Sequence, residues 1–176
     1  MKRRPRYYLL AILIGFGACT GIKPAASGGK AGKLYESFYR PDGATQYYIK
    51  PLTFSDDAHT AEVDFVYRSN FSADSLVTCN FSVTYPAIGA KLMSASFSTE
   101  DTYPLLALKK IYDERKGEEL YVRYTSKMKY GAFREVIVHS QRQLSLKTER
   151  KTLELSASSK TQKRLGAVQQ QLFFDR

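Results

Sequence analysis

In the segment from Leu76 to Tyr85, apolar and polar side chains alternate strictly from Val77 onward. On an extended chain, one face of this segment would carry Val77, Cys79, Phe81, Val83 and Tyr85. The other face would carry Thr78, Asn80, Ser82 and Thr84. A period of two is typical of an antiparallel β-strand that buries one face and exposes the other to solvent. Because an isolated strand is not stable in water, the segment predicts a β-rich domain with several further strands.

Other segments show the same alternation in a shorter or less regular form. They are residues 47–49, 62–68, 91–98 and 120–124, together with a hairpin of residues 143–148 and 152–156. About seven short strands joined by turns predict a mainly β domain with an antiparallel, β-sandwich-like arrangement. An α+β fold is the alternative, because helices are also expected.

Residues 105–112 are harder to assign. Behind Pro104, which suits the first turn of a helix, three residues recur at helical spacing: Leu105, Leu108 and Tyr112. Residues 113–119 are rich in charge and contain a glycine, which predicts a turn. Residues 133–138 fit either a short helix or a buried strand.

The C-terminal part predicts a helix. Ser158 or Ser159 is a candidate N-cap, because a serine hydroxyl can accept a hydrogen bond from a free amide of the first turn. Three apolar residues follow at helical spacing and would pack on the sheet: Leu165, Val168 and Leu172. From Lys147 to Arg176 the chain has seven basic and three acidic residues. This excess fits either a solvated face or a patch for anionic lipid headgroups or an acidic partner.

Residues 1–18 have the composition of a signal peptide. Four basic side chains come first: Lys2, Arg3, Arg4 and Arg6. The apolar stretch of residues 7–17 follows, and it is shorter than the ~20 residues of an ordinary membrane-spanning helix. Without residues 1–18 the chain carries 23 basic and 17 acidic residues, a net charge of +6 instead of +10. An exported chain of this modest charge is not expected to bind nucleic acid.

Residues Phe16-Gly17-Ala18-Cys19 stand at the end of this stretch. They resemble the lipobox of bacterial lipoproteins, and the N-terminal region is similar to that of small envelope lipoproteins of the Bacteroidetes type. The resemblance implies that Cys19 receives a diacylglycerol, that the chain is cut before it, and that the new amino terminus is acylated, for example with palmitate. Phe16 departs from the family pattern, which prefers an aliphatic residue there. Two or three acyl chains would anchor the protein stably, whereas a single chain binds a membrane only marginally.

Residues 19–33 join the lipidated cysteine to the rest of the chain. The stretch from Thr20 to Lys33 contains four Gly, three Ala and three Lys, which predicts a flexible tether with an r.m.s. span of ~20 Å. In the lipoproteins that this region resembles, an acidic cluster after the cysteine directs export to the cell surface. No acidic residue occurs here, which implies an outer-membrane protein that faces the periplasm. Residues 34–176 would then form a single β-rich globular domain.

Residues that could carry catalysis are few. His59 and His139 lie outside any multi-ligand metal pattern, and neither a nucleophile elbow nor a phosphate-binding loop occurs. Cys79 lies on the inward face of the clearest strand, which predicts a buried, inert thiol. The tripeptide around Ser75 resembles an O-glycosylation motif of exported Bacteroidetes proteins, and the sequence leaves its use open. We therefore predict no catalytic residue, no metal site and no cofactor, and one lipid attachment site, Cys19.

These observations predict a non-enzymatic protein of the bacterial envelope. It would be held at the membrane by the lipid on Cys19 and act as a binding or assembly module, with another envelope protein as its candidate partner. Tethering would raise its effective concentration near such partners. Two alternatives are open. An envelope enzyme with dispersed catalytic residues requires a deep pocket that contains His59 or His139, and a β-rich lipid- or ligand-binding protein requires an apolar cavity.

Overall fold

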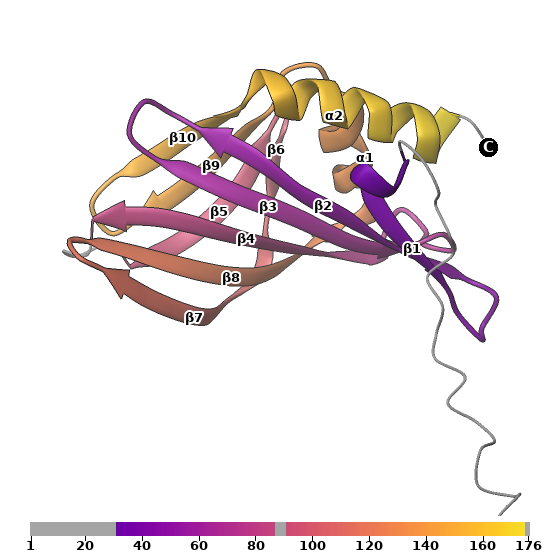
Figure 1. Ribbon diagram of the computed structural model, residues 1–176, viewed down its shortest axis with the longest axis horizontal. Coiled ribbons are helices and arrows are strands. Elements are labelled where there is room, and N and C mark those ends of the chain that lie inside the picture. Colours follow the sequence, from indigo (N-terminus) through magenta and orange to yellow (C-terminus); the bar gives the residue numbers. More distant parts are fainter. Residues whose placement is uncertain (1–30, 87–90, 175–176) are drawn as a thin grey trace, which may run out of the picture.

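The computed structural model describes residues 31–86 and 91–174 (Figure 1). The predicted signal peptide (residues 1–18), Cys19 and the tether up to residue 30 lie outside this part of the chain. The last three residues of the predicted tether, Ala31–Lys33, form a single 3-10 turn, η1. No described helix is long and apolar enough to cross a membrane.

The described residues form ten β-strands in one antiparallel sheet (Figure 1). The strands are β1 (Tyr35–Tyr39), β2 (Thr45–Ser55), β3 (Thr60–Arg68), β4 (Leu76–Pro86), β5 (Leu92–Ser98), β6 (Thr102–Pro104), β7 (Leu106–Lys116), β8 (Glu119–Lys129), β9 (Gln143–Thr148) and β10 (Thr152–Ala157). Their order across the sheet is β6-β5-β9-β10-β2-β3-β4-β8-β7, and β1 pairs with β2. The sequence predicted most of these strands, but not β1, the short β6 or β7.

The sheet curls into an almost closed barrel (Figure 1). One end of β2 pairs with β1 and its other end with β10, so the sheet changes direction along this strand. Pro51 has no backbone N–H to donate, and the register with β3 shifts between Ile49 and Leu52, which bends the strand. The predicted mainly β, antiparallel domain is confirmed. The facing layers expected of a sandwich are the two halves of one continuous sheet.

The alternation of β4 is confirmed by the structure. Its predicted inward residues are all buried: Val77, Cys79, Phe81, Val83 and Tyr85. β4 pairs with β3 on one side and β8 on the other without a register shift, so the period of two is kept along the whole strand. Aromatic side chains then meet across the barrel. The ring of Phe65 on β3 has its centroid 5.8 Å from that of Phe97 on β5 and 5.1 Å from that of Phe133.

Two helices cover one end of the barrel (Figure 1). Residues 133–138, which fitted either a helix or a strand in the sequence, belong to the helix α1 (Tyr130–Val138). This helix buries Phe133, Val136 and Ile137. The predicted C-terminal helix is α2 (Ser159–Gln169), which continues into a π-helical turn, η2 (Gln170–Phe174). Ser158 caps α2 by accepting a hydrogen bond from the amide of Thr161. The predicted apolar stripe of α2 is buried, as expected for a helix packed on the sheet.

The strand β7 decides one unassigned segment and corrects one prediction. Residues 105–112, whose spacing matched a helix but which the sequence left unassigned, belong mainly to this strand, as do residues 113–116 of the predicted turn. The register with β8 shifts at two places, between Leu106 and Lys109 and between Lys110 and Tyr112. Ala107 adopts a positive φ of 49° at the first shift. Each β-bulge inserts a residue that breaks the alternation, and the apolar side chains therefore fall at a spacing that imitates a helix.

Candidate functional site

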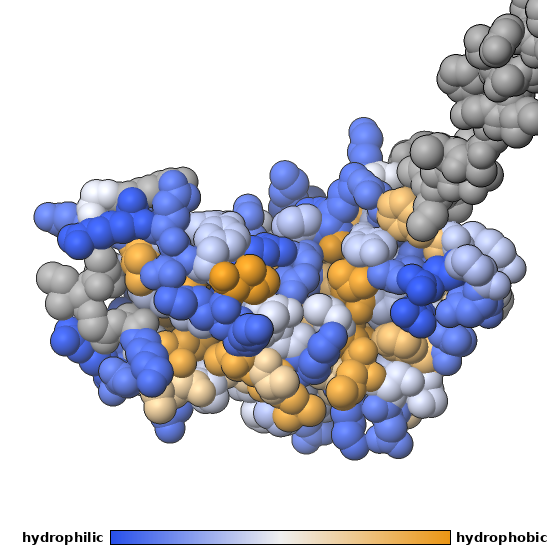
Figure 2. Space-filling model, turned by 90° about the horizontal axis from the view of Figure 1, so that it is seen from below, coloured by the Kyte–Doolittle hydropathy of each residue, from blue (hydrophilic) through white to orange (hydrophobic). Residues whose placement is uncertain are grey.

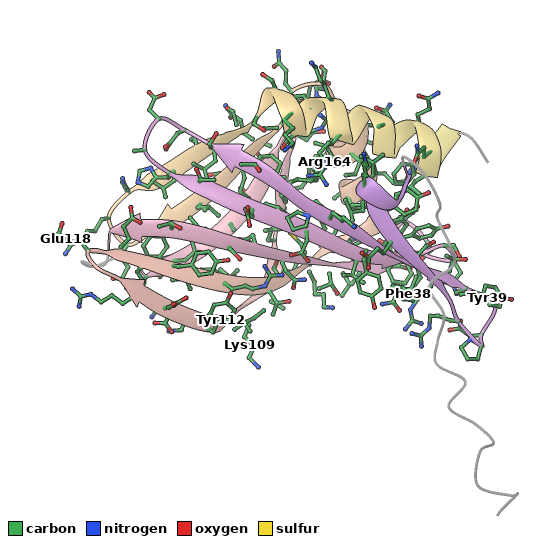
Figure 3. All side chains as sticks on the ribbon, in the orientation of Figure 1. Phe38, Tyr39, Lys109, Tyr112, Glu118 and Arg164 are labelled. Carbon is green, nitrogen blue, oxygen red and sulfur yellow. The ribbon has the colours of Figure 1, made fainter. Side chains whose placement is uncertain are left out.

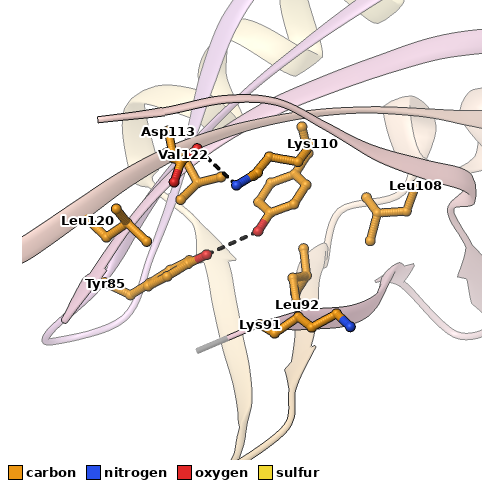
Figure 4. Close-up of a pocket in the computed structure, with 9 residues that line it drawn as sticks. Tyr85, Lys91, Leu92, Leu108, Lys110, Asp113, Leu120 and Val122 are labelled. Carbon is orange, nitrogen blue, oxygen red and sulfur yellow. Dashed lines mark hydrogen bonds and ion pairs between the residues drawn. The ribbon is translucent and has the colours of Figure 1, made fainter. Parts of the chain in front are cut away.

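A cavity opens where the edges of the curled sheet fail to meet, between the start of β5 and the pair β7–β8 (Figure 4). Its volume is about 420 Å³, which is within the usual range of small-molecule pockets. We call it the seam cavity, and it is lined by Tyr85, Lys91, Leu92, Leu108, Lys110, Asp113, Leu120, Val122 and Tyr124. Aliphatic and aromatic side chains thus form most of its wall.

The regular alternation of β8 supplies one side of the seam cavity. Leu120, Val122 and Tyr124 are inward residues of this strand. Opposite them on β7, Lys110 is the register partner of Tyr124, and Asp113 is the partner of Val122. Among the described strands, β7 pairs only with β8, so its inward side chains reach solvent at the open edge. Inward-pointing charges are also a common protection of an edge strand against pairing with another chain.

Two phenols meet in the wall of the seam cavity. The hydroxyls of Tyr85 and Tyr124 are hydrogen-bonded at 3.0 Å, and both side chains are buried (Figure 4). Phe81 stacks on Tyr124 with 5.3 Å between ring centroids. Burial, and next the hydrogen bond with Tyr85, raise the pKa of Tyr124 above its ordinary value. Tyr124 therefore keeps its proton at physiological pH. Either hydroxyl can be the donor of the bond between the two phenols, and the hydroxyl that does not donate within the pair can donate to a bound molecule.

The mouth of the seam cavity is charged. The Nζ atom of Lys110 lies 2.9 Å from Oδ1 of Asp113, and both side chains are about half exposed. Lys91 lies on the other lip, beside the start of β5. Two cations and one carboxylate give the mouth a net positive charge, which would attract an anionic group. An ion pair so exposed contributes little to stability, so a ligand can displace it at small cost.

Both histidines lie away from the seam cavity. His59 Nδ1 is 3.0 Å from the carboxylate of Asp56, and His59 Nε2 is 3.3 Å from Nζ of Lys151. His139 Nε2 lies 3.3 Å from Oε1 of Glu100. Neither histidine is among the residues that line the seam cavity. An envelope enzyme would require a deep pocket around His59 or His139, and the seam cavity is not that pocket.

The other residues singled out by the sequence have structural surroundings or lie outside the described part. Cys79 is fully buried, as its position on β4 predicted, and burial raises the pKa of its thiol. The hydroxyl of Ser126 donates a hydrogen bond to the backbone carbonyl of Cys79 at 2.8 Å. Ser75 Oγ accepts a hydrogen bond from the amide of Ser72 at 3.0 Å. The described residues contain no cluster of His, Cys, Asp or Glu placed to hold a metal ion. Cys19 lies outside them.

The sequence did not identify the seam cavity. The alternation places Tyr85 and Val122 on inward faces, where they resemble ordinary core residues. Lys110 falls in a segment that the sequence left unassigned because of its helical spacing, and Asp113 falls in the predicted turn. A charge at an inward strand position is the one signal available in the sequence, and the two bulges in β7 conceal which positions face inward.

Comparisons with known protein families, curated proteins and solved structures found no match to this chain. Its function has therefore to be inferred from its own geometry. The seam cavity combines an apolar wall with a few polar groups at defined positions.

Proposed function

We propose that this chain is a lipid-anchored protein of a bacterial envelope that binds a small amphipathic molecule and catalyses no reaction. The composition of the seam cavity carries the proposal: an apolar wall, a buried phenol pair and a charged mouth. A concave, mostly apolar lining with a few polar groups is typical of small-molecule sites. Aromatic and aliphatic side chains fill the interior behind this opening, so the ligand would lie at the seam of the barrel.

The lining defines the class of ligand. An apolar body would contact Leu92, Leu108 and Val122, and each CH2 group removed from water contributes about 0.8 kcal/mol. The free phenol proton of the tyrosine pair suits an acceptor oxygen within the ligand. A carboxylate head suits the two lysines at the mouth. We therefore expect monocarboxylic acids with an aliphatic or aromatic body to bind more tightly than neutral molecules of the same size.

The predicted anchor supports the same activity. Amphipathic acids partition into membranes, so a protein attached there would be close to its ligand. A tether with an r.m.s. span of ~20 Å would confine the domain near the membrane surface. This confinement raises the effective concentration of the seam cavity relative to membrane-bound ligand. Anchoring at Cys19 and binding at the seam would thus serve one purpose, the capture of amphipathic molecules at a membrane.

Leu108→Trp is expected to weaken ligand binding by at least about tenfold, because the larger ring fills the seam cavity from its rim. The measurement is a titration of the mature protein with dansylundecanoic acid, followed by the rise in dansyl emission. Leu106→Trp is the matched control, since Leu106 is exposed on the same strand and does not line the cavity. Equal affinities of the two variants would contradict the proposal.

Lys110→Glu is expected to weaken binding of the same acid by about fivefold, since an attractive charge at an exposed site contributes up to ~1 kcal/mol. The affinity for the neutral alcohol of equal chain length should stay unchanged. Lys109→Glu makes the same charge change on the neighbouring residue, which points away from the barrel, and should have little effect (Figure 3). Equal losses of affinity for acid and alcohol would disprove the assigned role of the charge.

A further inference from the structure

A group of cationic side chains lies where the chain enters the domain. One comes from η1 and three come from the first half of α2. Leu34 and Ala167 share shallow grooves of about 390 and 540 Å³ with these cations, which places the two segments side by side. Arg164 lies on the side of α2 that borders β2 and donates a hydrogen bond to the carbonyl of Pro51 at 2.7 Å (Figure 3). We call this surface the basic face of α2, and its cations are Lys33, Lys160, Lys163 and Arg164.

No acidic residue balances this charge within the segments that build the surface. Residues 159–174 contain none, and neither does the chain from Cys19 to Lys33. Among the described residues, none of the ion pairs involves one of the four cations. The basic face of α2 therefore presents a concentrated positive charge to its surroundings.

The position of the cations opposes the electrostatics of the helix. The N-terminal end of a helix carries the positive pole of its dipole, where acidic side chains are favourable and cations are unfavourable. Lys160 nevertheless lies in the first turn of α2, and that turn contains no acidic residue. Lys163 and Arg164 follow in the second turn. Helix stability does not account for this placement, whereas binding to an external anionic surface does.

We propose that the basic face of α2 binds the anionic phospholipid headgroups of the membrane that holds the Cys19 anchor. This inference rests on the anchor proposed above. Lys33 is the residue at which the predicted tether joins the domain, so the anchored lipid would lie at an r.m.s. distance of ~20 Å from the basic face. Clusters of basic residues beside a membrane anchor are attracted to anionic leaflets, and the attraction acts within about one Debye length.

Docking on α2 would also orient the domain. The helix α2 and the edge strand β7 lie on opposite sides of the barrel (Figure 1). The side opposite α2, seen in Figure 2, shows apolar residues scattered among charged ones. A domain docked through α2 would therefore turn β7 and the seam cavity toward the solution next to the membrane. The mouth would there be open to partners and to amphipathic acids that leave the bilayer.

The chain contains no Trp, so a single introduced Trp reports the position of one surface. The first reporter is Gln170→Trp, which lies two helical turns beyond Lys163. The lipidated variant is bound to vesicles that contain a lipid with a spin-labelled headgroup, which quenches the fluorescence of a nearby Trp. Glu118→Trp, in the turn between β7 and β8 at the far end of the molecule, is the control reporter (Figure 3). We expect the first reporter to be quenched in vesicles of phosphatidylcholine with phosphatidylglycerol and much less in phosphatidylcholine alone. The second should be unquenched in both.

Charge reversal tests the cause of the quenching. Lys160→Glu with Lys163→Glu should lower the ratio of docked to undocked protein by at least about 30-fold, because each cation near an anionic leaflet favours binding by roughly fivefold. Acidic residues at the start of α2 suit the helix dipole, so a loss of docking would not reflect melting of the helix. Lys109→Glu with Lys147→Glu makes the same change of net charge elsewhere and should dock normally.

Equal quenching of the two reporters would overturn the docking proposal, and so would quenching that survives the reversal of Lys160 and Lys163. Flotation of the same samples separates this result from failure of the anchor. Protein that floats with the vesicles but is not quenched is anchored and not docked. Protein that does not float lacks the anchor on which docking rests, and that result would overturn the proposed anchor and the docking together.

Discussion

Arg142→Met is expected to lower the free energy of unfolding of the domain by about 3–5 kcal/mol. Arg142 is buried between α1 and α2, with 5% of its surface exposed. Its Nε donates to the carbonyl of Val136 at 2.6 Å, and its Nη2 donates to the carbonyl of Ile137 at 2.7 Å. Its Nη1 donates to the side chain of Gln162 on α2. One guanidinium group therefore closes the end of α1 and joins it to α2.

The size of the expected effect follows from what the guanidinium group satisfies. The last carbonyls of a helix have no partner within the helix, and here two of them receive charge-assisted hydrogen bonds. Burial lowers the pKa of Arg142 to about 10, which leaves it charged at neutral pH. Methionine has a similar length but no donor, so the substitution leaves buried carbonyls without a partner at about 1–3 kcal/mol each.

The measurement is urea unfolding at pH 7 followed by circular dichroism. Arg164→Met is the matched control, because Arg164 is only partly buried and makes one hydrogen bond, to the carbonyl of Pro51. We expect the control to lose no more than about 1 kcal/mol. If both variants lost a similar free energy of unfolding, Arg142 would act by packing or by charge alone and not by hydrogen-bonding the last carbonyls of α1.

The sequence predicted the fold best where strand pairing is regular. The strand β4 lies between two neighbours, and every residue from Leu76 to Pro86 has a register partner on β8. Burial there follows the period of two, so the alternation could be read directly. The cap at Ser158 was also predictable, because it depends on local chemistry between a hydroxyl and an amide three residues later.

The features that the sequence did not reveal depend on contacts that leave no local pattern. The partners of Arg142 include backbone carbonyls of α1, and any residue type can supply a carbonyl. The seam cavity exists because the sheet curls at Pro51 and stops short of closing, which is a property of the whole barrel. The positive φ of Ala107 and the bulges in β7 then place Lys110 and Asp113 inward against the simple alternation.

Cys19→Ala is expected to remove the acyl chains and, with them, the stable attachment to the outer membrane. A thioether-linked lipid requires the cysteine sulfur, and each acyl CH2 group in the bilayer contributes about 0.8 kcal/mol. Because two or three chains are lost at once, we expect the membrane partition coefficient to fall by roughly a thousandfold or more. Intact mass should show the wild-type chain beginning at Cys19 with added acyl mass, and the variant without it. Flotation with isolated outer membranes measures the attachment itself.

Cys79→Ala is the matched control, because it removes the other cysteine of the chain, whose thiol is fully buried on β4. It should keep the acyl mass and the membrane attachment, since the predicted lipid is on Cys19 alone. An unmodified, soluble wild type would contradict the anchor, and so would full membrane attachment of Cys19→Ala. The N-terminus would then be an ordinary signal peptide or a signal anchor. Docking through α2 would lose its basis, whereas binding at the seam cavity, which depends only on the folded domain, would still stand to be tested by Leu108→Trp.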